Sequence, residues 1–130
     1  MRAAVVYQDE WLLYAIRSML RPIGCECIDV ALDSLPRGMP VRPIDLVILE
    51  VPTDERDAHR AVEAVKRCFN ALPITAIMQR NAAPQLPCLV IALGVRCAMS
   101  RPFSQQQLLQ VVREVTPMSR NEGTSIRKYA

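Results

Sequence analysis

Apolar residues form five short runs along the chain, and most of these runs are separated by stretches whose apolar residues have helical spacing. A strand that is covered on both faces is apolar throughout, so an apolar run predicts a buried strand. The second run is the least regular, because Glu26 and Asp29 interrupt it. The five predicted strands cover residues 3–7, 25–30, 45–51, 74–78 and 95–99. Strands that alternate with helices predict one α/β domain, built on a parallel sheet with helices on both faces.

The apolar spacing and the capping residues predict four helices. They begin after Asp9, at Thr53 or Asp54, at Pro84 and after Ser104. Ser104 and Gln107 have the spacing of a capping box. Between the second and third strands, the stretch LDSLPRGMPVRP contains three prolines and a glycine. These residues leave room for little more than a distorted turn of helix.

The length of 130 residues suits a single domain. Residues 1–116 are expected to form this domain, and the polar residues 117–130 are expected to be a linker or a disordered tail. The net charge is +3, of which +2 belongs to residues 117–130, so the predicted domain is nearly neutral. It lacks the basic face of a nucleic-acid-binding protein, and no direct binding of nucleic acid is expected.

Several function classes lack their sequence signals in this chain. No apolar run approaches the roughly 20 residues that span a membrane, and the amino-terminal residues do not resemble a signal peptide. We therefore expect no membrane contact and a location in the cytoplasm. The turn after the first predicted strand has no glycine motif for a dinucleotide or a nucleoside triphosphate. No cofactor is expected.

The five cysteines and the single histidine, His59, do not cluster at the spacings of a metal site. Cys25 and Cys27 alternate along a predicted strand, so their side chains share one of its faces. Two interpretations remain open for this pair. The cysteines are either small buried apolar side chains in a reducing compartment or residues with a redox role.

Glu50 stands near the end of the clearest predicted strand, DLVILEVP. In open parallel sheets, functional residues lie at the carboxyl ends of the strands, where the strand order reverses. Glu50 is therefore the first candidate for a functional site. It could also be a strand-end carboxylate that solvent and backbone donors satisfy.

Three segments together resemble the receiver domain of bacterial response regulators. VYQDEWLL has the place of that family's acidic turn, IDLVILEVP the place of its phosphoacceptor strand, and GVRCAMSRPF the place of its final strand and Lys-Pro turn. The resemblance covers residues 2 to about 115. It implies a flavodoxin-like, doubly wound, five-stranded sheet of order 2-1-3-4-5, with a degenerate second helix. It also implies a cis bond before Pro102.

The resemblance assigns the family's chemical positions to residues of other types in this chain. The two acids that bind Mg²⁺ fall on Gln8 and Asp9, with Glu10 adjacent. The phosphoacceptor falls on Glu50. The phosphate-binding hydroxyl falls on Met78 or Gln79, depending on where counting begins. The invariant lysine falls on Arg101, and the switch aromatic falls on Ala98.

These departures predict a degenerate phosphorylation pocket rather than a working one. Glutamate carries its carboxylate one methylene farther than aspartate, and arginine replaces a point charge by a planar fork. Arg101 is expected to pair with Glu50 or with Asp9. Three roles for Glu50 stay open, namely a structural pair or cap, mimicry of a phosphorylated aspartate, and residual metal binding with Asp9. The alternative is a working receiver that is phosphorylated on one of the carboxylates with Mg²⁺.

If the pocket is not phosphorylated, the function must depend on contacts with other proteins. No enzymatic activity is expected. The predicted helix at 84–93 is almost wholly apolar, so it is either covered inside the domain or faces a partner. The residues proposed for a partner surface are Leu86, Leu89, Val90 and Leu93. A homodimer is expected, and a regulatory protein is a second candidate partner.

A narrower resemblance concerns the pseudo-receivers of antiterminators of the amidase-operon type. It rests on RPIGCECIDV, on LDSLPRGMP and on APQLPCLVIALGVRCAMSRPF. Those proteins carry a C-terminal ANTAR domain that binds RNA. The resemblance implies the regulatory domain of a transcription regulator or antiterminator.

Overall fold

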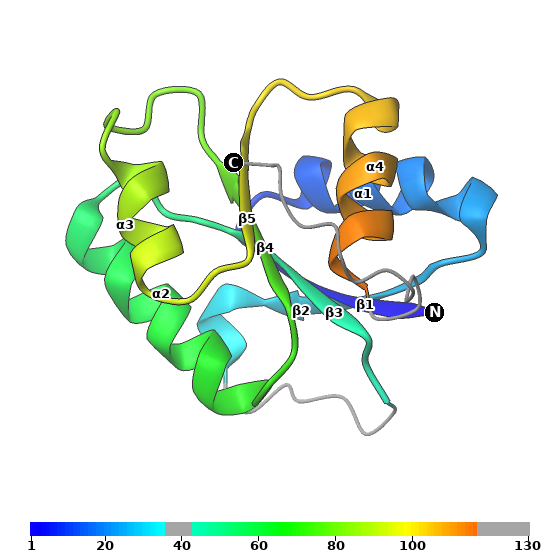
Figure 1. Ribbon diagram of the computed structural model, residues 1–130, viewed down its shortest axis with the longest axis horizontal. Coiled ribbons are helices and arrows are strands. Elements are labelled where there is room, and N and C mark those ends of the chain that lie inside the picture. Colours follow the sequence, from blue (N-terminus) through cyan, green and yellow to red (C-terminus); the bar gives the residue numbers. More distant parts are fainter. Residues whose placement is uncertain (36–42, 117–130) are drawn as a thin grey trace.

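The computed structural model describes residues 1–35 and 43–116, which form a five-stranded parallel sheet with helices on both faces (Figure 1). The strands are β1 (Arg2–Tyr7), β2 (Glu26–Ala31), β3 (Leu46–Glu50), β4 (Ile74–Met78) and β5 (Cys97–Ser100). Their order across the sheet is β2-β1-β3-β4-β5. The expected flavodoxin-like architecture and strand order are therefore confirmed.

Four α-helices and two short 3₁₀ turns complete the described fold. The helices are α1 (Glu10–Leu20), α2 (Glu55–Cys68), α3 (Leu86–Ala92) and α4 (Gln105–Val115), and the turns are η1 (Arg21–Ile23) and η2 (Leu32–Ser34). The single turn η2 begins the proline-rich stretch, as expected. The rest of that stretch, residues 36–42, and the predicted tail, residues 117–130, lie outside the described residues.

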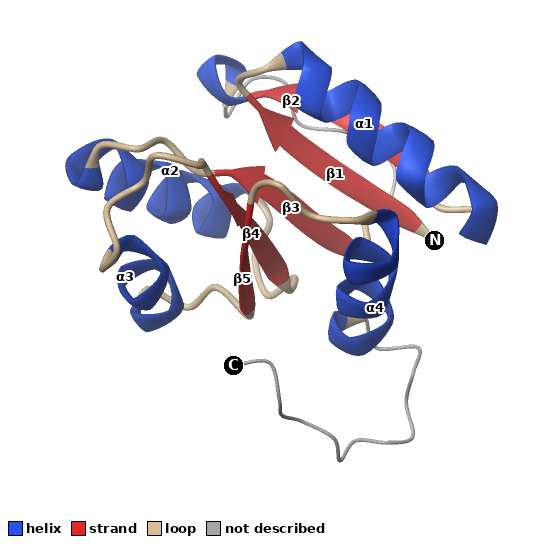
Figure 2. Cartoon of the chain, turned by 90° about the horizontal axis from the view of Figure 1, so that it is seen from above, coloured by secondary structure: helices blue, strands red, loops and turns tan. Residues whose placement is uncertain are grey.

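Helices α1 and α4 cover one face of the sheet, and α2 and α3 cover the other (Figure 2). The central strand β3 serves both layers because successive side chains point to opposite faces. Val47 and Leu49 pack with α2 and α3, whereas Leu46 and Ile48 pack with α1 and α4. All five residues of β3 are buried, Glu50 included.

The starts of α1, α2 and α4 follow the capping residues that the sequence predicts, whereas α3 begins at Leu86, two residues after the predicted start at Pro84. Asp54 is the N-cap of α2, and its carboxylate accepts a hydrogen bond from the N–H of Asp57 at 3.1 Å. Ser104 and Gln107 form the expected capping box at the start of α4. Each side chain satisfies a backbone N–H group that the first turn of a helix leaves without a partner.

Strand β5 begins two residues later than predicted, at Cys97 instead of Val95. The N–H of Val95 donates to the carbonyl of Val90 at 3.1 Å and helps to end α3. Gly94 makes this turn with a φ of 110°, which a side chain would strain. Val95 therefore belongs to the helix end and not to the sheet.

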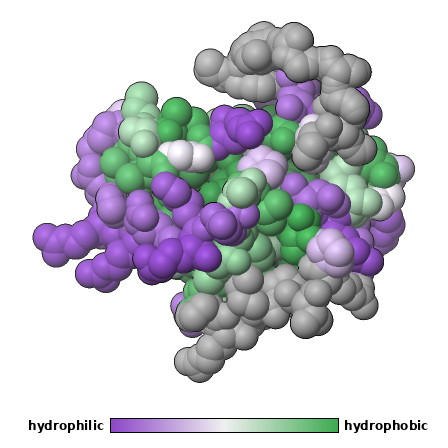
Figure 3. All heavy atoms as spheres, turned by 60° about the horizontal axis from the view of Figure 1, so that its bottom comes forward, coloured by the Kyte–Doolittle hydropathy of each residue, from purple (hydrophilic) through white to green (hydrophobic). Residues whose placement is uncertain are grey.

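The peptide bond between Arg101 and Pro102 is cis, as the resemblance implies. Within the described residues, none of the helices has both the length and the apolar character to cross a membrane. Figure 3 shows hydrophilic residues gathered on the side of the molecule that carries α2, whose outer positions are largely charged.

Candidate functional site

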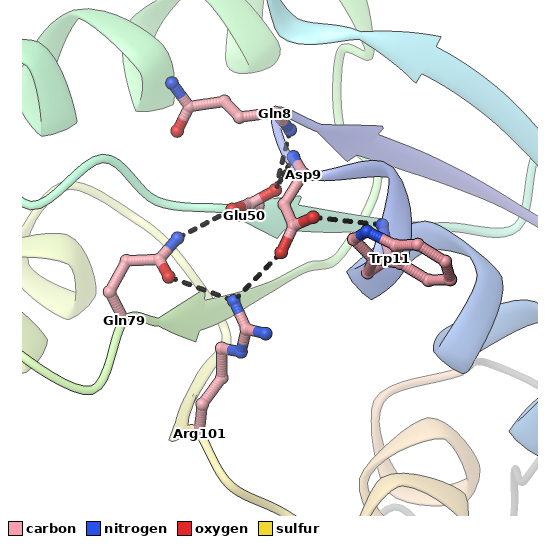
Figure 4. A network of polar contacts seen from close by, with 6 residues as sticks. All are labelled: Gln8, Asp9, Trp11, Glu50, Gln79 and Arg101. Atoms are coloured by element: carbon pink, nitrogen blue, oxygen red, sulfur yellow. Dashed lines mark hydrogen bonds and ion pairs between the residues drawn. The ribbon is translucent and has the colours of Figure 1, made fainter.

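Glu50 ends β3 as a buried carboxylate, with only 4% of the residue exposed. Its Oε1 accepts hydrogen bonds from the backbone N–H of Gln8 at 2.6 Å and of Asp9 at 2.8 Å. Its Oε2 accepts one from the side-chain amide of Gln79 at 2.7 Å (Figure 4). A buried carboxylate is tolerated when donors replace the water that it loses. Both oxygens of Glu50 meet this condition.

Asp9 lies in the turn between β1 and α1 and has two separate tasks. Its Oδ1 accepts the N–H of Trp11 at 3.0 Å and thereby caps α1. Its Oδ2 lies 3.5 Å from Nη1 of Arg101. About a third of each of these two side chains is exposed, so water screens part of their attraction.

The side chain of Gln79 connects Glu50 with Arg101. Its amide nitrogen faces Glu50, and its amide oxygen accepts a hydrogen bond from Nη1 of Arg101 at 3.1 Å. An amide can donate and accept at once, so it bridges a carboxylate and a guanidinium without a charge of its own. Glu50, Gln79, Arg101 and Asp9 therefore form a closed ring of contacts at the carboxyl ends of β1, β3 and β4 (Figure 4).

Five of the predicted pocket residues line one hollow of about 470 Å³. They are Gln8, Asp9, Glu50, Gln79 and Arg101. Sequence reasoning missed five further lining residues, namely Pro52, Thr53, Asp54, Asp57 and Asn81. They follow β3 and β4 directly or open α2, so their position at the carboxyl ends of the strands was the signal that could have found them.

Two predicted pocket residues lie elsewhere. Met78 was one of two candidates for the phosphate-binding position, but only 1% of it is exposed and it packs in the core under α2 and α3. Neighbouring strand residues point to opposite faces, so Gln79 takes the position in the network. Glu10 is the first residue of α1, where it is exposed and does not line the hollow.

Of the two partners expected for Arg101, the structure has Asp9 and not Glu50. The contact to Asp9 uses one guanidinium nitrogen, and the same nitrogen reaches Gln79. The bidentate fork that arginine makes possible is therefore not formed with Asp9. The negative charge of Glu50 is balanced by backbone and amide dipoles instead.

The resemblance implies Mg²⁺ between the acidic turn and the end of β3, and the residues present do not fit this ion. The N–H groups of Gln8 and Asp9 point at Glu50, where a cation would need a free oxygen. Both oxygens of Asp9 are engaged, one with Trp11 and one with Arg101. In residues 1–35 and 43–116, no three His, Cys, Asp or Glu side chains are arranged to hold a metal ion.

The proposed partner surface on α3 needs correction. Leu86 and Val90 are completely buried in the core that α3 shares with α2, and Leu89 and Leu93 pack against that core as half-buried residues. A seven-residue helix pressed on a sheet buries most of an apolar sequence within its own domain. The large apolar residue that α3 exposes is Ile91, at 46%.

A parallel sheet of this order, with a polar cluster at the carboxyl ends of β1, β3 and β4, is the fold of the receiver domains of two-component response regulators. A receiver domain from Clostridium thermocellum has a TM-score of 0.74, 15% identity, and coverage of 88% of this chain and 95% of that one. A receiver protein from Burkholderia phymatum has a TM-score of 0.70, 23% identity, and coverage of 88% and 93%.

NtrX from Brucella abortus is also similar in structure, with a TM-score of 0.76 and 19% identity. The match covers 91% of this chain but only 27% of NtrX, so the chain corresponds to about a quarter of that protein. Neither the protein-family models nor the curated protein sequences compared with the chain matched it. The similarity therefore establishes the fold.

Proposed function

We propose that this chain is a pseudo-receiver, a signalling module that works through protein contacts without being phosphorylated and without catalysing a reaction. The observation that supports this proposal is the bonding of Glu50. Three donors from within the domain engage its two oxygens. A phosphoryl acceptor must instead present an oxygen in line with its donor, and it depends on a metal to neutralise the developing charge.

The contacts of Arg101 support the same proposal. In the receiver family the corresponding lysine is implied to meet the phosphoryl group. Here the guanidinium is shared between Asp9 and Gln79. A phosphoryl group on Glu50 would have to displace either the Gln79 amide or the backbone N–H groups of Gln8 and Asp9. Asp9, the acid at a metal-binding position of the family, is already paired with Arg101. The network is complete without an added charge.

Among the three roles left open for Glu50, the structural cap has the most support. Oε1 binds the backbone of the β1–α1 turn and so fixes the place where α1 begins. Mimicry of a phosphorylated aspartate would direct the carboxylate toward Arg101. The ion pair of Arg101 with Asp9 argues for the cap.

We propose a second copy of this chain as the partner of the outer side of α3. The helix has the sequence LPCLVIA, which contains no charged residue. Two copies of an uncharged surface can meet about a twofold axis without bringing like charges together. Ile91 would be the central apolar contact, with the exposed residues Cys88 and Ala92 beside it.

The output of the module is proposed from the sequence. The resemblance of RPIGCECIDV and APQLPCLVIALGVRCAMSRPF to the pseudo-receivers of amidase-type antiterminators favours the regulatory domain of a transcription regulator or antiterminator. The nearly neutral predicted domain favours a role in protein contact over direct contact with nucleic acid.

Incubation with acetyl phosphate and Mg²⁺, followed by intact mass spectrometry, tests the proposal. The mass of the chain is expected to stay unchanged, while a phosphorylatable receiver domain in the same tube gains one phosphoryl group and shows that the reagent works. Trp11 is the only tryptophan, and its backbone N–H donates to Asp9, so its fluorescence would report Mg²⁺ binding at this carboxylate. Because we propose that no Mg²⁺ binds there, we expect the fluorescence to stay unchanged when Mg²⁺ is added. A phosphoryl group found on Glu50 or Asp9 would replace the proposal by that of a working receiver.

A further inference from the structure

The outer side of α1 carries two aromatic rings that the described residues leave largely uncovered. Trp11 is 78% exposed and Tyr14 is 50% exposed. Their rings meet edge to face with centroids 6.1 Å apart, which is a favoured geometry for an aromatic pair. The ring of Trp11 points away from the Glu50 network (Figure 4). Tryptophan and tyrosine are enriched at contact surfaces, so this pair indicates a docking surface.

An acidic residue borders the aromatic pair. Glu10 is the first residue of α1, is exposed, and forms no ion pair with a residue that the structure describes. Residues four apart on a helix are neighbours on its surface, so Glu10 and Tyr14 lie on the same side. A cation fits this combination, because both a carboxylate and the face of an aromatic ring attract a guanidinium or an ammonium group.

The chain has a basic segment after its last described residue. Residues 117–130 contain three basic residues and one acidic residue, for a net charge of +2. Arg127 and Lys128 stand between Ile126 and Tyr129, so the same short stretch combines two cations with two side chains that can make apolar contacts. Its charge and its apolar residues both complement the aromatic and acidic surface of α1.

The basic segment begins close enough to α1 to reach this surface. Helices α1 and α4 cover the same face of the sheet, and the side-chain amide of Gln105 on α4 donates to the carbonyl of Met19 on α1 at 3.0 Å. Each helix has 11 residues and is therefore about 16 Å long. Fourteen extended residues span up to about 46 Å. Residues that follow Thr116 can therefore lie along α1 while both helices keep their places.

We propose that residues 126–129 dock on the outer side of α1 in the same chain, where Arg127 stacks on Trp11 and Lys128 pairs with Glu10. A planar guanidinium suits stacking, and a compact ammonium suits a single carboxylate. Each contact is weak, but the connection through α4 gives the segment an effective concentration on the order of 1 mM. A contact with a dissociation constant of about 1 mM is then occupied about half of the time. This contact goes beyond the proposed function, because it involves neither the Glu50 network nor α3.

Trp11 is the only tryptophan of the chain, so its fluorescence reports the docking directly. Acrylamide, an uncharged quencher, should give the unchanged chain a quenching constant about half of that for Arg127→Glu/Lys128→Glu, because the segment covers the ring about half of the time. Added salt should reduce this difference. The control Arg80→Glu/Arg96→Glu reverses two exposed charges beside β4 and β5 and should quench as the unchanged chain does. Equal constants for the unchanged chain and the tail variant would overturn the proposal.

Crosslinking locates the segment independently of fluorescence. A carbodiimide couples a carboxylate with an amine that contacts it, and Lys128 and Lys66 are the only lysines. We expect an amide between Lys128 and Glu10, identified by peptide mass spectrometry. In an equal mixture of unlabelled and nitrogen-15-labelled chains, both halves of this crosslinked product should carry the same label. Mixed labels would assign the contact to a second copy, and coupling of Lys128 only to other acids would place the segment elsewhere. Either result would overturn the proposal.

Discussion

The guanidinium of Arg101 lies 3.5 Å from Oδ2 of Asp9, and its hydrogen bond to Gln79 connects it with Glu50 only indirectly. The cation of Arg101 thus pairs with the partly exposed carboxylate of Asp9, while neutral donors bind the buried carboxylate of Glu50. Neutral donors in a fixed place avoid the cost of desolvating a guanidinium at the end of β3. Because Glu50 and Arg101 do not pair directly, substitutions of the two residues should change the free energy of unfolding by different amounts.

Replacing Glu50 by alanine should destabilise the domain by about 3 kcal/mol, because the substitution leaves buried donors without an acceptor. Urea denaturation followed by far-UV circular dichroism measures the change in the free energy of unfolding. Glu114→Ala removes an exposed glutamate from α4 and should change it by less than about 0.5 kcal/mol. Equal effects of the two substitutions would contradict the capping role of Glu50.

Replacing Arg101 by alanine should cost about 0.5–1 kcal/mol, since the ion pair with Asp9 is partly exposed and salt screens it. The measured loss should shrink when the same urea titration is repeated at high ionic strength. Arg60→Ala is a matched control because Arg60 lies 3.8 Å from Asp57 in a more exposed pair. A loss for Arg101→Ala as large as that for Glu50→Ala would mean that Arg101 compensates the buried carboxylate directly.

Replacing Ile91 by arginine should convert the expected dimer into a monomer. Two copies would bring two positive charges and their desolvation cost to the centre of the interface. Size-exclusion chromatography with light scattering measures the mass in solution over a range of concentrations. Trp11→Arg places the same charge on the exposed side of α1, where 78% of the tryptophan is accessible, and should leave the mass unchanged. A monomeric parent chain would exclude the proposed dimer.

Replacing Cys27 by alanine should move the alkylation of Cys25 to higher pH. The thiol of Cys27 is the first cause that lowers the pKa of Cys25. Without this donor the thiolate loses stabilisation, the pKa rises, and the midpoint of the pH–rate profile rises with it. Iodoacetamide labelling between pH 6 and 10, read by peptide mass spectrometry, measures the profile. Cys68→Ala, on the other side of the sheet, should not shift it.

The fold was predictable because the central strands Leu46–Glu50 and Ile74–Met78 are almost wholly apolar and three helices have explicit caps, at Asp9, Asp54 and Ser104. The ends of Ile74–Met78 were predicted to the residue. The position of Glu50 at the carboxyl edge followed from the parallel sheet alone. The predicted start of β5 at Val95 was wrong, because the N–H of Val95 bonds to Val90 in the turn after α3 and not to a neighbouring strand. Whether the N–H of Val95 bonds to α3 or to a neighbouring strand depends on the path of the turn after α3. The pattern of apolar and polar residues does not determine this path.

The details of the site were less predictable for two reasons. Counting forward from Pro73 gave Met78, and counting back from Gly94 gave Gln79. A shift of one residue along a strand moves a side chain to the opposite face. The partner of Arg101 depends on how far a long side chain reaches, which spacing does not determine. Leu86 and Val90 were misplaced because a helix without polar residues gives no stripe that indicates its inner side.

The bonds from Gln8 and Asp9 to Glu50 join residues 42 and 41 positions apart. The first turn of α1 therefore receives part of its stabilisation from a carboxylate that arrives only when β3 has docked beside β1. An isolated peptide of residues 1–24 would have the Asp9 cap but not this second support. In the folding of the whole chain, we expect the amino-terminal turn of α1 to become ordered after the central strands have paired, and not before.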